Sequence, residues 1–251
     1  MPLLGNVNDI KSLSRDALAQ FVADNVASVF EDEALAILDN RNCTSAICSQ
    51  IARSQRLTAF YSVRLKLAAH RQTPLAHAVK LVHYLYWADL LRLSVDVKVP
   101  PPVRRAVDNI LLTKVTRITL GEKIATARRC SAALIKVLLH DPDPKVFEAL
   151  LTNARLREDE LVDLASSSRA TPEQLRILSD DRKWSYRYAI RKAVVLNPNT
   201  PRSVAASHLR FLRRDDLRAI HANPSTSTYL RRCIERLRPV AERRGVTSTQ
   251  D

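Results

Sequence analysis

The chain has 251 residues, of which 46% are hydrophobic and 26% charged, and its formal net charge at pH 7 is +14. This length and apolar content suffice for one large or two ordinary folded domains, and they exclude an intrinsically disordered chain. Only 3 glycines are present, and none lies in a glycine-rich stretch, so the phosphate-binding loops of Rossmann and P-loop proteins are excluded as well.

The sequence predicts a soluble, cytoplasmic protein. Its first ten residues lack the basic and apolar layout of a signal peptide. No stretch reaches the roughly 18 uninterrupted apolar residues that a membrane span needs.

The first half of the chain predicts short helices. Apolar residues recur at helical spacing, and Asp, Asn, Ser or Thr stands before most segments, often with Pro just inside. We expect a helical cap over 1–32 and a first repeat block over 33–111. The helices expected in that block are Glu33–Leu38, Ser45–Ala52, Phe60–His70, Thr73–Tyr86 and one that begins at Pro100.

The second half follows the same plan more clearly. Residues 112–139 have the spacing of a linker helix stacked between two blocks, 140–244 form the second repeat block, and 245–251 are expected to be a disordered tail. The helices expected in the second block are one that ends at Leu151, Arg157–Ala165, Thr171–Leu178, Trp184–Leu196, Thr200–Leu212, a short one from Asp215, and Ser227–Arg244. None of these short helices buries its apolar stripe alone, so they must stack.

The two halves match each other when the sequence is shifted, without a gap, so that Tyr61 falls on Tyr188. This shift also matches Arg64 with Arg191, Thr73-Pro74 with Thr200-Pro201, Asp89-Leu90 with Asp216-Leu217, and Arg104-Arg105 with Arg231-Arg232. Self-similarity at a long fixed period is typical of repeat proteins, and stacked repeats usually form binding surfaces. The sequence therefore predicts an all-α solenoid with an internal duplication.

Several stretches resemble known helical repeats. The pattern Asp-Pro-Asp-Pro-x-Val-x-x-Ala-Leu at 141–150 is similar to the opening of a HEAT-like repeat, as are Tyr-Arg-Tyr-Ala-Ile-Arg-Lys-Ala at 186–193 and Pro-Val-Arg-Arg-Ala-Val at 102–107. Together with Asn-Pro-Asn-Thr-Pro at 197–201, they resemble the bacterial leucine-rich variant repeat, which pairs an α-helix with a shorter helix.

The resemblance covers residues 33–111 and 140–238, and it implies a solenoid of short stacked helices. Some relatives of the variant repeat carry a cysteine-rich cluster for an iron–sulfur centre. This chain lacks such a cluster, so that role is not implied here.

Basic residues are concentrated in two blocks. Residues 61–140 carry 14 basic and 4 acidic side chains, and residues 181–251 carry 16 and 6, a net charge of +10 in each block. Arginine outnumbers lysine 30 to 10, and its planar guanidinium suits bidentate contacts with phosphate or carboxylate. The residues expected on a basic binding face are Arg187, Lys192, Arg210, Arg213, Arg214, Arg218, Arg231, Arg232, Arg104 and Arg105.

Four charged residues matched by the shift are assigned a structural role instead. Because arginine and aspartate recur together, we expect an internal ladder of Asp–Arg pairs that ties adjacent helices. The residues of this ladder are Arg64, Asp89, Arg191 and Asp216.

The aromatic residues form two groups at helical spacing, which favours core positions over a surface for stacking nucleic-acid bases. These groups are Tyr84, Tyr86 and Trp87 in the first half, and Trp184, Tyr186 and Tyr188 in the second.

The four cysteines predict neither a metal site nor a cofactor. Cys43 and Cys48 are five residues apart, with no second pair near enough to complete a zinc or iron–sulfur spacing. Cys130 and Cys233 fall at apolar helix positions, where a buried free thiol is expected.

These observations predict a non-enzymatic scaffold that binds an anionic macromolecule, either an acidic protein segment or nucleic acid; an anionic membrane surface is a third option. The alternative is a DNA- or RNA-binding protein, including an alkyl-base DNA glycosylase, since some of these are built on HEAT-like repeats and use a basic face, tryptophans and one carboxylate. The chain has a tryptophan for such a site, Trp184. Its candidate carboxylate, Asp216, is matched by Asp89 in the first half, which favours a structural role over a catalytic one.

Overall fold

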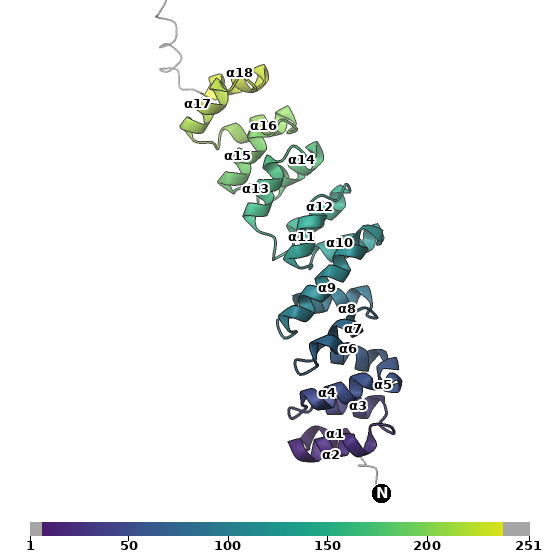
Figure 1. Cartoon of the computed structure of the whole chain (residues 1–251). Coiled ribbons are helices and arrows are strands. Elements are labelled where there is room, and N and C mark those ends of the chain that lie inside the picture. Colours follow the sequence, from purple (N-terminus) through teal and green to yellow (C-terminus); the bar gives the residue numbers. More distant parts are fainter. Residues whose placement is uncertain (1–6, 238–251) are drawn as a thin grey trace, which may run out of the picture. The chain divides into compact units, whose positions relative to one another are not determined.

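The structure is a computed structural model that describes residues 7–237, and every regular element in that range is a helix (Figure 1). These residues form 18 α-helices and one short 3₁₀-helix, without a β-strand. The chain divides into two compact units, unit 1 up to Thr119 and unit 2 from Leu120 onward. The all-α prediction is confirmed, whereas the expected helix end at Arg244 and the tail over 245–251 lie outside the described residues.

In unit 1 the main contacts join helices that are close in chain order. Helix α3 packs on α1 and α6, and α9 packs on α7 and α8, so each short helix covers its apolar stripe with its neighbours. The described elements of unit 1 are α1 (Val7–Ser12), α2 (Arg15–Asn25), α3 (Glu31–Asp39), α4 (Ser45–Arg53), α5 (Gln55–Ala59), α6 (Tyr61–Ala69), α7 (Leu75–Val82), α8 (Trp87–Val95), α9 (Pro101–Lys114) and the 3₁₀-helix η1 (Val115–Arg117).

Unit 2 is built in the same way. Helix α12 packs on α10 and α14, α15 packs on α13 and α16, and α18 packs on α16 and α17. The described elements of unit 2 are α10 (Leu120–Ala127), α11 (Ala132–Leu138), α12 (Pro144–Leu151), α13 (Glu158–Ser166), α14 (Pro172–Asp180), α15 (Tyr188–Leu196), α16 (Arg202–Leu209), α17 (Arg214–Ala222) and α18 (Thr228–Leu237).

Most of the expected helices are present, but three differ in extent. The helix expected over Thr200–Leu212 covers only Arg202–Leu209. The helix expected over Thr73–Tyr86 covers only α7, and α8 follows it as a separate helix. The helix expected over Trp184–Leu196 begins only at Tyr188. The Asp181 carboxylate accepts the Trp184 N–H at 2.9 Å, and this bond holds a turn in front of α15.

The segment 112–139 also differs from the expected single linker helix. It contains the end of α9, then η1, α10 and α11, and the boundary between the units falls inside it, after Thr119. Ser131 has an extended backbone and acts as the N-cap residue of α11, which separates α11 from α10. Both helices pack with α12 in unit 2.

The helices α15 to α18 share an apolar cluster at the C-terminal end of unit 2. The buried members of this cluster are Val195, Leu209, Leu212, Ile220 and Ile234. Tyr188 and Cys233 pack against it, and Cys130 is fully buried elsewhere in the unit. The buried free thiol expected at both positions is thus present at Cys130, which lies in the turn between α10 and α11 and not in a helix, whereas Cys233 on α18 is only half-buried.

Buried asparagines close the loops that follow α3, α12 and α15. Asn40, Asn153 and Asn197 are buried, and the Nδ2 of each donates to two carbonyl oxygens at or just after the end of an earlier helix. Asn197 donates to Ala165 at 2.6 Å and to Ser167 at 2.9 Å. Since the last carbonyls of a helix have no partner within that helix, these bonds satisfy groups that stacking would otherwise bury unpaired.

The same asparagines order their own loops. The Oδ1 of Asn40, Asn153 and Asn197 accepts the backbone N–H two residues further on, at 2.8, 2.9 and 2.9 Å. A histidine, His70, stands at the corresponding position after α6, where its Nδ1 accepts the Gln72 N–H at 3.2 Å. One polar side chain in each of these loops thus orders the turn. Residues other than asparagine do the same elsewhere: Asp96 after α8 accepts the Lys98 N–H, and Asp181 after α14 accepts the Lys183 N–H.

We expect Asn197→Ala to lower the free energy of unfolding by about 1–3 kcal/mol, because two carbonyls and one N–H lose their partner. Urea unfolding followed by circular dichroism measures the loss. Asn109→Ala, an exposed position on α9, is the control and should stay within about 0.5 kcal/mol of wild type. Equal losses in the two variants would contradict this role for the buried asparagines.

Candidate functional site

A tyrosine–aspartate pair joins α15 to α17 in unit 2. The Tyr188 hydroxyl donates to the Asp216 carboxylate and accepts the Arg213 N–H at 3.1 Å. Lys192 forms an ion pair with the same carboxylate at 2.8 Å. Lys192, followed by the Tyr188 hydroxyl, lowers the pKa of Asp216 below its ordinary value, so this carboxylate stays ionised down to a lower pH than usual.

The same arrangement occurs in unit 1, at the positions that the sequence shift matches to these. The Tyr61 hydroxyl donates to the Asp89 carboxylate and accepts the Tyr86 N–H at 3.1 Å. Burial, followed by the Asp89 carboxylate, raises the pKa of Tyr61, so its hydroxyl remains a donor. Arg92 pairs with Asp89 at 2.9 Å.

These contacts correct the expected ladder of Asp–Arg pairs. Both aspartates are bonded to tyrosines, and the arginines donate to backbone carbonyls instead. Arg64 Nε donates to the Thr58 carbonyl at 3.0 Å, and Arg191 Nε donates to the Ser185 carbonyl at 2.6 Å. The four residues do tie elements together, but the aspartates act through tyrosine hydroxyls and the arginines act by closing a preceding turn.

Arginines and aromatic rings alternate over α15 and the turn between α16 and α17. The Arg191 guanidinium lies 4.0 Å from the centroid of the Phe211 ring and 5.9 Å from that of Tyr186. Arg210 lies 4.6 Å from the same Phe211 ring, and Arg213 lies 4.8 Å from the ring of Tyr188. We call this set the arginine–aromatic surface; its residues are Tyr186, Tyr188, Arg191, Arg210, Phe211 and Arg213.

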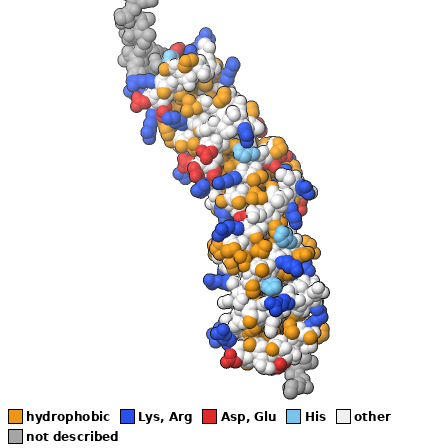
Figure 2. Space-filling view, viewed as in Figure 1, with side chains coloured by type: hydrophobic (Ala, Val, Ile, Leu, Met, Phe, Trp, Pro, Cys, Tyr) orange, Lys and Arg blue, Asp and Glu red, His pale blue; other side chains and the backbone are white. Residues whose placement is uncertain are grey.

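Tyr186 is 69% exposed and Phe211 42%, so the surface faces solvent. Figure 2 shows basic side chains over the region of α15 to α17. Tyr84 and Tyr86 in unit 1 are also exposed. The core position expected for the aromatic groups is therefore wrong for these three tyrosines, which lie in the turns before α8 and α15 and not on a helix.

Trp184 does lie in the core. It is 4% exposed, and its indole N–H donates to the Leu151 carbonyl at 3.1 Å. Its ring is therefore not available for stacking on a nucleic-acid base. Phe211, which the sequence did not single out, contributes a ring to the surface because it lies in the turn between two helices.

Several of the predicted basic residues are already engaged. Lys192 pairs with Asp216, Arg187 with Glu158 at 3.5 Å, and Arg218 with Asp215 at 3.4 Å. The other exposed arginines that the sequence placed on the basic face in unit 2 have no carboxylate within ion-pair distance among residues 7–237; they are Arg210, Arg213, Arg214 and Arg232.

Arg231 and the two unit 1 arginines are placed differently. Arg231 is half-buried and donates to the carbonyls of Asn223 and Pro224, each at 2.9 Å, so it orders the loop after α17 instead of facing a partner. Arg104 is half-buried and Arg105 exposed on α9 in unit 1. The structure therefore brings together only part of the predicted basic face.

His208 on α16 is a buried polar side chain. It is 8% exposed, and its Nδ1 has no hydrogen-bond partner within the described part of the chain. Burial, followed by the positive charge of Arg191, lowers the pKa of His208 below its ordinary value of 6.5. The structure therefore holds this imidazole neutral.

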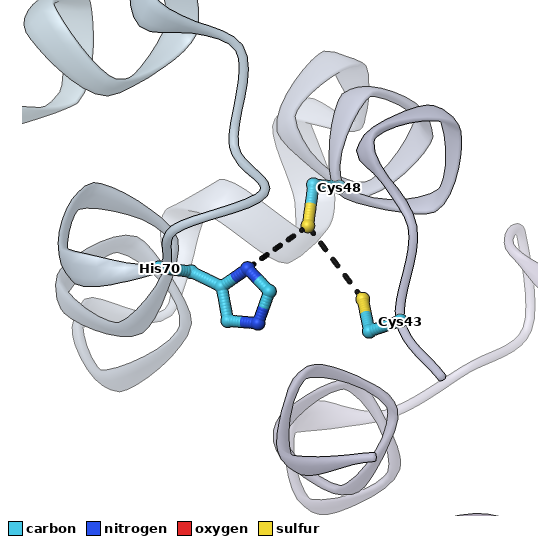
Figure 3. A group of neighbouring side chains, drawn as sticks. All are labelled: Cys43, Cys48 and His70. Atoms are coloured by element: carbon cyan, nitrogen blue, oxygen red, sulfur yellow. Dashed lines mark hydrogen bonds between the residues drawn. The ribbon is translucent and has the colours of Figure 1, made fainter. Parts of the chain in front are cut away.

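One group of side chains has the composition of a metal site. Cys43, Cys48 and His70 lie together in unit 1 (Figure 3), with their ligand atoms within 4.8 Å of one another. Cysteine spacing alone does not find the group, because His70 lies 22 residues beyond Cys48. The sequence predicted no metal site because no second cysteine pair lies near enough; the structure instead brings His70 to the two cysteines as a third candidate ligand.

Comparisons of the chain with protein-family models, with curated proteins and with solved structures give no match. None of the helices within residues 7–237 combines the length and the apolar character required to cross a bilayer.

We expect Tyr188→Phe to lower the free energy of unfolding by about 1–2 kcal/mol, because Asp216 loses a donor and the Arg213 N–H loses its acceptor. Tyr61→Phe should cost a similar amount. Tyr84→Phe, at an exposed ring, should stay within about 0.5 kcal/mol of wild type. Urea unfolding of the three variants tests this, and a loss in Tyr84→Phe equal to the others would contradict it.

We expect stability to fall below pH 6.5 in part through His208. The pKa of His208 is lower in the folded protein than in the unfolded chain, so the unfolded chain takes up the proton first as the pH falls. The stability that the neutral imidazole contributes is therefore complete above pH 6.5, and it is lost as the pH falls toward the lowered pKa of the folded state. Urea midpoints at about pH 7.5 and about pH 5.5 measure this loss. His208→Gln should reduce the difference between the two midpoints, whereas the exposed His83→Gln should preserve it.

Proposed function

We propose that this protein is a non-enzymatic repeat scaffold that binds an anionic macromolecule through the arginine–aromatic surface of unit 2. The observation that carries the proposal is the set of guanidinium groups held against aromatic rings at that surface. A guanidinium stacked on a ring loses little further freedom on binding and keeps its N–H donors at its edge. Such groups are suited to bidentate contacts with phosphate or carboxylate oxygens.

The local charge supports the same proposal. Arg210, Arg213 and Arg214 are exposed around a single turn, and among the described residues no carboxylate pairs with them. The two nearest acids in the sequence, Asp215 and Asp216, pair with Arg218 and Lys192 instead. An incoming anion thus meets unpaired positive charge and displaces no internal salt bridge.

Within this proposal, nucleic acid is the second, narrower candidate partner. The exposed Tyr186 and Phe211 rings lie beside Arg191 and Arg210, and single-strand binders combine a basic surface with aromatic rings that stack on bases. An acidic protein segment would use the guanidinium groups but gain less from the rings. We do not extend the proposal to base excision, because Trp184 is buried and Asp216 is bonded to Tyr188 and Lys192.

We also propose that the chain is a HEAT-like or leucine-rich variant solenoid, of the bacterial type, that arose by internal duplication. The support is the recurrence of whole contacts at positions matched by the sequence shift: tyrosine to aspartate, tyrosine to a backbone N–H, and arginine to a carbonyl six residues earlier. The repeated loop asparagines add to it. A cytoplasmic location fits the four free cysteines, since reducing compartments keep thiols unpaired.

The test is fluorescence anisotropy with single-stranded DNA, single-stranded RNA and an acidic peptide, across a salt series. We expect binding near physiological salt, weakened by about tenfold or more when Arg210, Arg213 and Arg214 are replaced by alanine. For a nucleic-acid partner the log–log salt slope should fall by about 2 to 3, because up to three phosphate contacts are removed.

The matched control replaces three exposed arginines elsewhere with alanine, namely Arg15, Arg117 and Arg155, and changes the net charge equally. Its affinity should stay close to wild type. Equal weakening in the two triple variants would mean that total charge alone drives binding, and the proposed surface would be wrong. Binding of the peptide but not of either nucleic acid would select an acidic protein as the partner.

A further inference from the structure

Three soft or borderline metal ligands meet in unit 1. Cys43 lies in the loop after α3, Cys48 in α4, and His70 at the end of α6, and their side chains point toward one another (Figure 3). The two Sγ atoms are 3.6 Å apart, and Cys48 Sγ is 3.3 Å from His70 Nδ1. All three ligand atoms lie within 4.8 Å of one another.

These separations are close to those that a tetrahedral zinc ion imposes. Zn–S bonds of about 2.3 Å and Zn–N bonds of about 2.0–2.1 Å place two sulfurs about 3.8 Å apart and a sulfur and a nitrogen about 3.5 Å apart. The observed values of 3.6 and 3.3 Å differ from these by only a few tenths of an ångström. The third separation, between the ligand atoms of Cys43 and His70, is no more than 4.8 Å.

We infer that Cys43, Cys48 and His70 bind one Zn²⁺ ion and leave its fourth coordination position open. Two thiolates and a neutral imidazole balance the two positive charges of the ion, so the loaded site is neutral. This matters because both cysteines are buried and an unbalanced charge there would be costly. The inference concerns unit 1 and is independent of the binding surface proposed for unit 2.

The choice of histidine at position 70 supports the site. In the loops after α3, α12 and α15 the corresponding residues are Asn40, Asn153 and Asn197, and each donates to carbonyls of an earlier helix. The shift that matches Tyr61 with Tyr188 also places His70 on Asn197. His70 keeps the turn through the Gln72 N–H but directs its ring at Cys48.

The tautomer of His70 also favours metal binding. Because His70 Nδ1 accepts the Gln72 N–H, this nitrogen carries a lone pair and the ring proton is on Nε2. On binding, the ion displaces the protons of the two thiols and takes the Nδ1 lone pair in place of the Gln72 N–H.

The fourth position of the ion has access to solvent. Cys43 and His70 line an open pocket of about 670 Å³. Basic side chains predominate among its charged lining residues, which are Asp39, Arg41, Lys66, Arg71, Asp96 and Lys98. A water, or the anionic end of a small ligand drawn by these bases, can complete the coordination, as in zinc sites that have three protein ligands.

The test is titration of the reduced, metal-free full chain with Co²⁺, which reports tetrahedral thiolate coordination through a near-ultraviolet charge-transfer band and strong visible bands. Zn²⁺ then displaces Co²⁺ and gives the affinity. We expect one ion per chain and a sub-micromolar dissociation constant for Zn²⁺. His70→Asn and Cys48→Ser should each weaken binding by about 100-fold or more, since loss of an outer partner alone already costs 10–100-fold.

His70→Asn is the sharper variant, because asparagine is the residue that the same loop position carries elsewhere in the chain, so the fold is kept. Cys233→Ser, in unit 2, is the control for the number of thiols and should bind as wild type does. Circular dichroism verifies the folding of each variant. The inference is overturned if reduced wild-type protein gives no thiolate–Co²⁺ band, or if that band survives in both His70→Asn and Cys48→Ser.

Discussion

Satisfying the carbonyl ends of buried helices is the constraint on which this structure depends. Helices this short place a large share of their carbonyl groups in the last turn, where no partner exists within the helix. When another helix stacks on that end, water is excluded and the carbonyls need a donor from the protein. Asn40, Asn153 and Asn197 supply that donor and order their own loops with the same amide. Stacking and loop conformation are thus coupled through one buried side chain.

The arginines also satisfy backbone carbonyls, but not all of them do so. Arg64, Arg191 and Arg231 donate to backbone carbonyls and close turns, so their charge is secondary to their geometry. Arg210 and Arg213 instead lie against aromatic rings with their donors toward solvent. Arg191 does both, because its guanidinium reaches a carbonyl on one side and the ring of Phe211 on the other. The proposed binding surface therefore includes contacts that hold α15 to α17 together.

Each of the two candidate sites includes a position at which the two matched halves of the chain carry different residues. The arginine–aromatic surface lies where the Tyr188–Asp216 contact repeats the Tyr61–Asp89 contact of unit 1, but with Arg213 in place of Tyr86, which adds positive charge. The cysteine–histidine group includes His70, which the shift matches with Asn197. The matched contacts thus hold the helices together, and each proposed site includes a residue that differs between the matched positions.

Periodicity and caps in the sequence were enough to predict an all-α chain, most of its helices and the residues that recur between its two halves, because these depend on residue type and on neighbours within a few positions. Partners across the stack were not predictable. Charge alone paired Asp216 with arginine, whereas geometry gives it the hydroxyl of Tyr188. Helical spacing placed Tyr186 in the core, but the helix begins only at Tyr188, and Tyr186 lies in the exposed turn before it.

What the sequence by itself determined is therefore local: where helices begin and end, which side chains are apolar, and where basic residues accumulate. The tertiary structure alone decided which distant groups meet. His70 approaches Cys48 only because α4 and α6 pack together, and Arg191 reaches Phe211 only because α16 folds back on α15. Distance along a chain carries no information about distance in space once the helices stack, so the sites formed by such contacts emerge only from the packing.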